Sequence, residues 1–198
     1  DELPARLNEY DVITVRSATK VRKALIDAAP NLKAIGRGGV GVDNIDVEYA
    51  KEKGIPTYNT PASSSLSVAE LVFASLFGCV RFLPDSNRKL PVEGSTKFND
   101  LKKAYAKGVE LRGKTLGIVG FGRIGREVAK IAIGVGMDVI AYDLYPFSPE
   151  LELVLGGGIT VKATVKTVSL EEVITTSDFI TLHTPFIDKA LLGADELA

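Results

Sequence analysis

The chain is poor in the side chains that build disulfides and metal centres. Of its 198 residues only Cys79 is a cysteine and only His183 is a histidine. A single cysteine excludes an internal disulfide, which is typical of proteins from reducing compartments. The sequence shows no cluster of residues at metal-ligand spacing, so we expect no metal site. Because Cys79 lies in an apolar run, we expect a small buried hydrophobe rather than a nucleophile.

Long hydrophobic runs and an excess of charge are also missing. The longest apolar run, Leu71 to Val80, is much shorter than the roughly 20 residues that span a bilayer. No targeting segment opens the chain, so we expect a cytoplasmic protein. The net charge of −1 gives no reason to expect a nucleic acid or a membrane surface as partner.

A glycine turn lies between a predicted strand and a predicted helix. Thr115 to Val119 is a short apolar run rich in β-branched residues, and apolar residues recur at helical spacing after residue 125. Strand, turn and helix in this order are typical of the first half of a dinucleotide-binding βαβ unit. In such a unit Gly120 permits the tight turn, Gly122 admits a pyrophosphate, and Gly125 allows close packing of helix on strand.

An acidic residue ends the next predicted strand, Met137 to Tyr142. Asp143 follows that strand, close to the spacing of about 20 residues after the glycine turn that is typical of a ribose-binding acid. Such a carboxylate accepts hydrogen bonds from the ribose hydroxyls and repels a 2′-phosphate, so the sequence predicts NAD rather than NADP as cofactor. The alternative is a simple turn residue ahead of Pro146.

The first third of the chain alternates predicted strands and helices. Strands are expected near residues 11–15, 32–35 and 55–58, with Thr19 and Asp46 as the N-caps of the helices between them. This order predicts parallel strands covered by helices. Arg16 and Arg37 fall at the carboxyl ends of two strands, where a guanidinium suits an anionic substrate. The alternative is two surface arginines in turns.

The middle and the end of the chain carry weaker patterns. Ser67 and Glu70 form a potential capping box that opens an apolar helix over residues 67–83, which we expect to be buried between domains or against a second subunit. The polar segment 85–113 is predicted to be an irregular connection. Residues 146–158 are predicted to be irregular, with a short strand within 159–168. A helix capped by Ser169 and a strand over 178–182 follow.

Six stretches, taken in chain order, resemble the D-isomer-specific 2-hydroxyacid dehydrogenases. They are residues 15–21, residues 36–46, Asn59-Thr60-Pro61 with residues 67–71, the glycine turn with Arg123, Tyr142-Asp143, and Leu182-His183-Thr184-Pro185. The resemblance implies an α/β fold of two Rossmann-like parallel-sheet domains, both incomplete in this chain. A flavodoxin-like substrate domain would span residues 1–60 and an NAD-binding domain residues 61–198, with the active site in the cleft between them.

The resemblance implies the NAD-dependent oxidation of a small 2-hydroxy acid. Within the family the motifs are most similar to the branch that oxidises D-3-phosphoglycerate to 3-phosphohydroxypyruvate, the first step of phosphorylated L-serine biosynthesis. The segment from Arg16 to Lys20, together with Arg37, favours a phosphorylated substrate. Two alternatives stay open. One is a glyoxylate or hydroxypyruvate reductase or a D-lactate dehydrogenase, and the other is a non-catalytic NAD sensor similar to the corepressors of this fold.

The same resemblance assigns roles to particular residues and implies a homodimer. The cofactor would be bound by residues of the glycine turn and three later positions: Gly120, Gly122, Arg123, Ile124, Gly125, Asp143, Thr184 and Pro185, with the backbone of Val40 at the nicotinamide end. The anionic substrate would be bound by residues of the first domain: Arg16, Arg37, Gly39, Val40 and Asn59.

The catalytic residues of the family are not expected in this sequence. The family's Arg, Glu and His follow the Leu-His-Thr-Pro motif by more residues than the chain contains, so they are expected beyond Ala198. His183 belongs to the motif itself and is predicted to have a packing role or to make a backbone hydrogen bond. We therefore expect the 198-residue chain to bind NAD weakly and to be inactive by itself.

Overall fold

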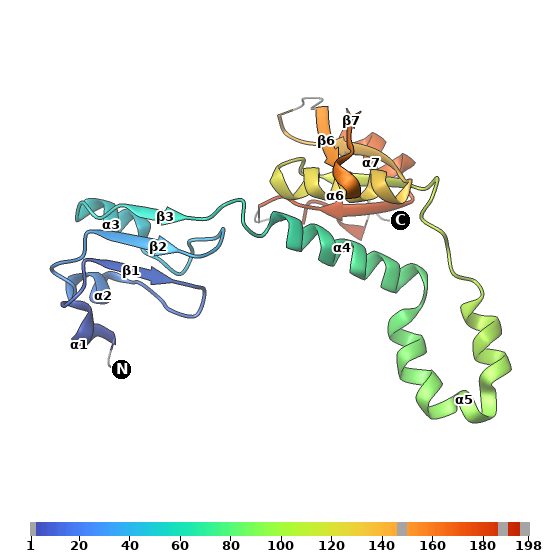
Figure 1. Cartoon of the computed structure of the whole chain (residues 1–198), viewed down its shortest axis with the longest axis horizontal. Helices are drawn as coiled ribbons and strands as arrows, with labels where there is room; N and C mark the ends of the chain where they lie inside the picture. The colour runs from blue at the N-terminus through green and yellow to red at the C-terminus, as the bar shows by residue number, and fades with distance from the viewer. Residues whose placement is uncertain (1–2, 146–149, 186–189, 195–198) are drawn as a thin grey trace. The chain divides into compact units, whose positions relative to one another are not determined.

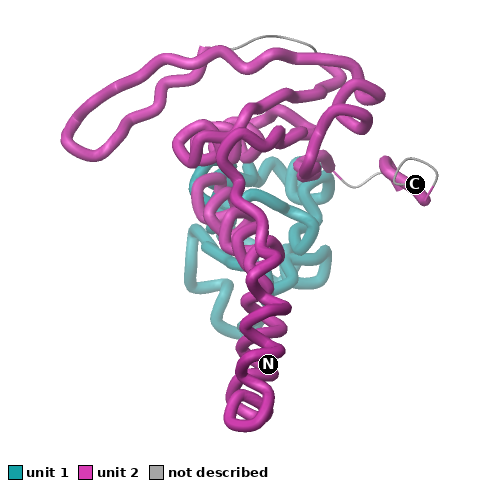
Figure 2. The backbone as a smooth tube through the Cα atoms, turned by 90° about the vertical axis from the view of Figure 1, so that its right-hand side faces the viewer, with its two compact units in different colours: residues 1–64 teal, residues 65–198 magenta. Residues whose placement is uncertain are grey.

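The computed structural model describes residues 3–145, 150–185 and 190–194. The chain divides into two compact units, Asp1–Ser64 and Ser65–Ala198 (Figure 2). This division falls a few residues after the boundary at residue 60 that the sequence indicates. Each unit has its own hydrophobic core and its own parallel sheet, which makes the fold α/β.

The first unit is a small parallel sheet with helices in the connections. Its elements are α1 (Leu3–Leu7), β1 (Val12–Val15), α2 (Lys23–Asp27), β2 (Ala34–Arg37), α3 (Val47–Glu52) and β3 (Thr57–Asn59), with the strands in the order β1-β2-β3 (Figure 1). Ile13 and Val15 of β1 are buried while Val12 and Thr14 are exposed, because alternate side chains of a strand point to opposite faces. The three predicted strands are confirmed to within a few residues.

One of the two predicted helix caps in this unit is confirmed and the other is wrong. Asp46 caps α3 by accepting a hydrogen bond from the Tyr49 amide at 3.3 Å. Thr19 caps nothing, since α2 begins only at Lys23 and its N-cap, Arg22, makes no side-chain cap bond. The reason is tertiary: Val21 forms a parallel bridge with Ile45, which keeps the backbone extended where the helix was expected.

The second unit has a four-stranded parallel sheet, a β-hairpin and a long bent helix, α5, which is called the helical arm below. Its elements are α4 (Ser65–Val80), α5 (Leu83–Tyr105), β4 (Thr115–Val119), α6 (Arg123–Val135), β5 (Asp138–Tyr142), β6 (Glu150–Val154), η1 (Gly156–Gly158), β7 (Thr160–Thr164), β8 (Lys166–Thr167), α7 (Leu170–Thr176) and β9 (Phe179–Leu182). The sheet order is β8-β5-β4-β9. β4 lies inside the sheet and is buried from Leu116 to Val119, and α4 and α6 share the core beside it.

The helix predicted over 67–83 is in fact α4, which begins at Ser65 and ends at Val80. Ser67 therefore lies inside the helix, and the predicted capping box is wrong. α4 is only partly covered within the unit: Phe73 is buried, whereas Leu71 and Cys79 are exposed. The expectation that Cys79 is buried is also wrong. Only one side of α4 packs on the core of the unit, and Cys79 does not lie on that side.

The segment predicted to be irregular over 85–113 is mostly the helix α5. Ion pairs four residues apart, Lys89 with Asp85 at 3.0 Å and Lys97 with Glu93 at 2.8 Å, support this polar helix. Lys97 has non-helical backbone angles, and at this point the helix doubles back (Figure 1). The Tyr105 hydroxyl consequently donates to the Asp85 carboxylate at 3.0 Å, although twenty residues of straight helix would separate them by about 30 Å.

A single helix long and apolar enough to cross a membrane does not occur in the part of the chain that the structure describes. α4 and α5 meet that test only as a pair, by length and composition, and are bent by 51° where they join.

The segment after β5 is more regular than its sequence indicates. β6 and β7 form an antiparallel hairpin, with Leu151 and Leu153 buried and Gly157 and Gly158 at positive φ in the turn. Residues 146–149 of the predicted irregular stretch lie outside the described residues. The Ser169 cap is confirmed, since its hydroxyl accepts from the Glu172 amide at 3.1 Å.

Candidate functional site

The three glycines of the turn between β4 and α6 have different surroundings. Gly120 has a φ of +93°, and a Cβ there would lie 2.7 Å from the carbonyl of His183. A Cβ on Gly125 would overlap the carbonyl oxygen of Gly120, so this position must be glycine for the helix to pack on the turn. Gly122 is exposed and has open space around it. The turn is therefore tight on its protein side and open towards solvent at its middle glycine.

The open side of the turn leads directly into the N-terminus of α6. The N-cap is Gly122, which has no side chain to cap the helix. Arg123 and Ile124 are the first two residues of this 13-residue helix. Amides of a first helical turn have no acceptor within the helix, and the helix dipole is positive at this end. Open space beside such amides suits a phosphate group.

Asp143 is held against the same turn. Its Oδ2 accepts a hydrogen bond from the Phe121 amide at 2.7 Å, and its Oδ1 accepts from the Tyr145 amide at 3.1 Å. The pairing of Val119 with Tyr142 in the parallel β4–β5 ladder places the ends of the two strands side by side. Each carboxylate oxygen has more than one lone pair, so both oxygens can accept a further hydrogen bond.

His183 lies at the end of β9, next to the glycine turn. Its amide donates to the Val119 carbonyl at 2.7 Å, and its Nε2 is 3.0 Å from the Thr181 hydroxyl. The side chain is half-buried, and burial lowers the pKa of the imidazole. Thr184 and Pro185 follow it in the chain and are exposed. The glycine turn, Asp143 and this segment thus gather at the carboxyl ends of β5, β4 and β9.

The predicted substrate residues gather at the carboxyl end of the other sheet. Val15, Arg37 and Asn59 are partners across β1, β2 and β3, so Arg37 and Asn59 end adjacent strands, and Arg16 directly follows the third. The Asn59 side-chain amide donates to the Val40 carbonyl at 2.6 Å. Arg16, Arg37, Gly39, Val40 and Asn59 are therefore brought together within the first unit.

The side chain of Arg37 folds back onto the loop that follows β2. The Arg37 guanidinium occupies the space where a side chain at residue 39 would lie, and its Nη1 donates to the Gly38 carbonyl at 2.8 Å. Gly39, with a φ of +147°, donates its amide to the Thr60 hydroxyl at 2.8 Å. In this conformation the amide of Gly39, a predicted substrate-binding residue, is bound to Thr60.

The sequence-based interpretation overlooked two residues at this edge, Thr60 and Asn44. Thr60 holds the Gly39 amide, and the buried side chain of Asn44 donates to the carbonyls of Arg16 and Thr19 at 2.9 and 2.7 Å. One signal was available for Asn44: an asparagine just before the apolar Ile45, after a glycine-rich loop, is a candidate for a side chain that holds backbone.

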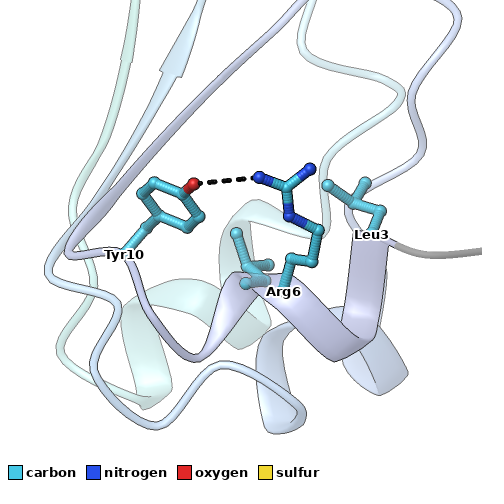
Figure 3. A pocket seen from close by; sticks show the side chains of 4 residues that line it. Leu3, Arg6 and Tyr10 are labelled. Atoms are coloured by element: carbon cyan, nitrogen blue, oxygen red, sulfur yellow. Dashed lines mark hydrogen bonds between the residues drawn. The ribbon is translucent and has the colours of Figure 1, made fainter.

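A pocket of about 270 Å³ lies elsewhere in the first unit, lined by Leu3, Arg6, Leu7 and Tyr10. There Arg6 donates to the Tyr10 hydroxyl at 3.4 Å (Figure 3). None of the predicted site residues lines this pocket. Among the described residues no group of three or more His, Cys, Asp or Glu side chains is arranged to hold a metal ion.

The class of protein follows from a family comparison that agrees with this geometry. The model of the catalytic domain of the D-isomer specific 2-hydroxyacid dehydrogenases matches residues 1–184. The chain belongs to this family.

Two relatives and one solved structure indicate the range within the family. Hydroxypyruvate reductase of Thermotoga maritima is 46% identical over 96% of this chain and 56% of its own length. D-3-phosphoglycerate dehydrogenase of Methanocaldococcus jannaschii is 41% identical over 100% of this chain and 36% of its own length. The structure of D-lactate dehydrogenase from Aquifex aeolicus, solved with NAD and lactic acid, is 31% identical with a TM-score of 0.66, over 93% of this chain and 51% of that one. The chain thus spans about half the length of such relatives or less.

Proposed function

We propose that the chain carries the cofactor-binding and substrate-binding residues of an NAD-dependent D-2-hydroxyacid dehydrogenase. The observation that supports this most is the hydrogen bond of 2.7 Å from the Phe121 amide to Asp143. It joins the acid that would bind the ribose to the turn that would bind the diphosphate. The solved D-lactate dehydrogenase complex, whose fold this chain shares, contains NAD.

The residues around the turn fit this cofactor. The open space at Gly122 and the first amides of α6 suit the diphosphate, and the carboxylate of Asp143 suits two ribose hydroxyls and disfavours a 2′-phosphate. Thr184 and Pro185 would flank the cofactor, with the Val40 backbone towards its nicotinamide end. NAD, when bound, accepts the hydride from the substrate carbon that carries the hydroxyl.

For the substrate we propose D-3-phosphoglycerate, oxidised to 3-phosphohydroxypyruvate. Two guanidinium groups, of Arg16 and Arg37, belong to the same sheet edge as Asn59. A substrate with an anionic group at each end can use two cations, whereas hydroxypyruvate or lactate carries one carboxylate only. The Methanocaldococcus jannaschii relative carries this activity in its name, and the Thermotoga maritima relative is named for hydroxypyruvate.

Turnover by the full-length protein tests the proposal. We expect a higher kcat/KM for D-3-phosphoglycerate with NAD than for D-glycerate or D-lactate, and a preference for NAD over NADP. Arg16→Ala should raise the KM for D-3-phosphoglycerate by about tenfold, as expected when one charged hydrogen bond is lost. Arg6→Ala, an exposed arginine on α1, is the matched control. If Arg16→Ala leaves this KM unchanged, the proposal of a phosphorylated substrate is wrong.

We further propose that the protein is a homodimer built on α4 and α5. These helices expose several large apolar side chains: Leu71, Leu83, Leu90, Val92 and Phe98. Several large exposed apolar side chains on two consecutive helices favour an interface there. A second copy of the chain is the partner that the family resemblance implies.

A further inference from the structure

The two arginine loops of the first unit are tied together by one buried side chain. Asn44 is 6% exposed, and its Nδ2 donates to the Arg16 carbonyl at 2.9 Å and to the Thr19 carbonyl at 2.7 Å. The loop from Arg16 to Thr19 follows β1, whereas Asn44 belongs to the loop that follows Arg37, the last residue of β2. One amide therefore reaches from the second loop to both ends of the first.

The backbone on either side of Asn44 reinforces this connection. The Val21 amide donates to the Asn44 carbonyl at 2.8 Å, and the Asp46 amide donates to the Val21 carbonyl at 2.9 Å. The Arg22 guanidinium donates to the Asp43 carbonyl at 2.8 Å. These contacts begin at residue 21. Before Arg16, the Gly38 amide donates to the Val15 carbonyl at 2.9 Å, and among the contacts of the described residues the side chain of Asn44 is the one that binds the Arg16 backbone itself.

The Asn44 side chain uses its NH₂ group to hold two backbone carbonyls, whereas its oxygen has no hydrogen-bond partner among the described residues. Both atoms that face its Nδ2 are carbonyl oxygens, which can only accept, so the amide must present its NH₂ group to them. Its Oδ1 is buried without a hydrogen-bond partner among the described residues, and such a group costs stability. An apolar side chain of similar size would avoid that cost but would leave the carbonyls of Arg16 and Thr19 without this donor.

We propose that Asn44 is a positioning residue for substrate binding: it fixes the backbone of Arg16 relative to the Arg37 loop, so that both guanidinium groups meet one anionic substrate. This inference rests on the proposed function, since it assigns Asn44 a role in the affinity of that site. Asn44 acts through Arg16 and touches no reacting atom.

A double-mutant cycle in the full-length protein tests this role. We expect Asn44→Ala to raise the KM for D-3-phosphoglycerate by about tenfold, with a smaller change in kcat and no change in the Kd for NAD. In an Arg16→Ala background the same change should alter KM by less than about twofold, because the group that it positions is already absent. Asn44→Leu, which keeps a similar volume but has no donor, should behave as Asn44→Ala does.

The control is Asn31→Ala, because the Asn31 side chain also donates to a backbone carbonyl, that of Asn8 at 2.7 Å, in the same unit. It should leave KM at the wild-type value. Melting temperatures of all variants separate lost stability from lost positioning, since a purely structural role lowers the melting temperature without coupling to Arg16 in KM. If Arg16→Ala raises KM and Asn44→Ala adds its full effect to it or has none, the positioning role is refuted while the proposed function stands. If Arg16→Ala itself leaves KM unchanged, the positioning role and the proposed phosphorylated substrate are both refuted.

Discussion

Single side chains in this protein are defined by the backbone groups that they hold. The Asp143 carboxylate is bound by the amides of Phe121 and Tyr145, and the Asn44 amide binds two carbonyls. Asp143 directly follows β5, and Asn44, in the loop between β2 and α3, binds the carbonyl of Arg16, which directly follows β1. Each side chain therefore holds loop backbone beyond the carboxyl end of a strand. Substitutions there are expected to change binding more than folding.

Replacing Asp143 should change the choice of cofactor. Asp143→Ala removes the acceptor for the ribose hydroxyls and the charge that repels a 2′-phosphate, so we expect the Kd for NAD to rise by about tenfold and discrimination against NADP to fall. Titration of the full-length protein with each cofactor measures both. Asp138→Ala, an exposed aspartate at the start of the same strand, is the control. Unchanged discrimination after Asp143→Ala would remove the ribose assignment.

His183 should make the stability of the chain depend on pH. Burial lowers the pKa of its imidazole in the folded protein, so the unfolded state binds a proton more readily. Its contribution is therefore fully present above the unfolded pKa of about 6.5 and is lost as the pH falls towards the lower folded value.

Urea unfolding between pH 8 and pH 5.5, compared for the wild type and His183→Asn, measures this effect. Because the chain has one histidine, the difference between the two curves in this window belongs to His183. The wild type should lose more stability than the variant on acidification. Parallel curves would contradict a half-buried imidazole with a lowered pKa.

At the scale of elements, α6 contains two glycines whose effects on stability have different causes. Tertiary packing decides one, and intrinsic helix propensity decides the other. Gly125 faces the Gly120 carbonyl, whereas Gly134 lies near the other end of the helix with open space around it. The same amino acid is thus required at one position and costs helix stability at the other.

Two alanine substitutions in α6 should therefore have opposite effects. Gly125→Ala forces a methyl group against the Gly120 carbonyl, and we expect it to destabilise the chain by about 1–3 kcal/mol and to weaken NAD binding. Gly134→Ala should stabilise it by up to about 1 kcal/mol. Urea unfolding and cofactor titration of both variants provide the comparison. A neutral Gly125→Ala would mean that the turn can relax away from the helix.

The whole molecule divides into two compact units, and the second unit also carries the helical arm, α5. Each unit gathers its predicted site residues at the carboxyl end of its own parallel sheet, which is where open α/β sheets bind ligands. The arm carries none of these residues. Val92 and Phe98 of α5 are 78% and 56% exposed, and the Asp85–Tyr105 bond fixes the two halves of the arm on each other.

Charges on the arm should dissociate the proposed homodimer. Val92→Lys combined with Phe98→Lys places two cations on the apolar surface of α5, and desolvating them on association is unfavourable. Sedimentation of the full-length protein should then show half the wild-type mass, with an unchanged circular dichroism spectrum. Asn99→Lys, at an exposed polar position of the same helix, should leave the mass unchanged. A double variant with wild-type mass would exclude α5 from the interface.

Local sequence determined the parts of this protein in which neighbours along the chain make the decisive contacts. Thr115–Val119 is a strand as predicted, the helix after the glycine turn follows from its periodicity, and Asp46 and Ser169 cap helices through amides three residues away. Asp143 was predicted to be the ribose-binding acid because dinucleotide-binding units carry such an acid at a typical distance along the chain, and that role stays a proposal.

Tertiary structure alone decided what depends on residues far apart in sequence. The bridge between Val21 and Ile45 displaced the start of α2. Composition indicated a loop over residues 85–113, but the structure has a helix there whose two halves are joined by the bond from Tyr105 to Asp85. The hairpin of β6 and β7 formed because Leu151 and Leu153 found a core to enter. Asn44 looked like one polar residue in a loop, and only the fold brought the carbonyls of Arg16 and Thr19 to its amide. Propensity and spacing describe the chain locally, whereas a buried polar side chain is defined by the partners that folding supplies.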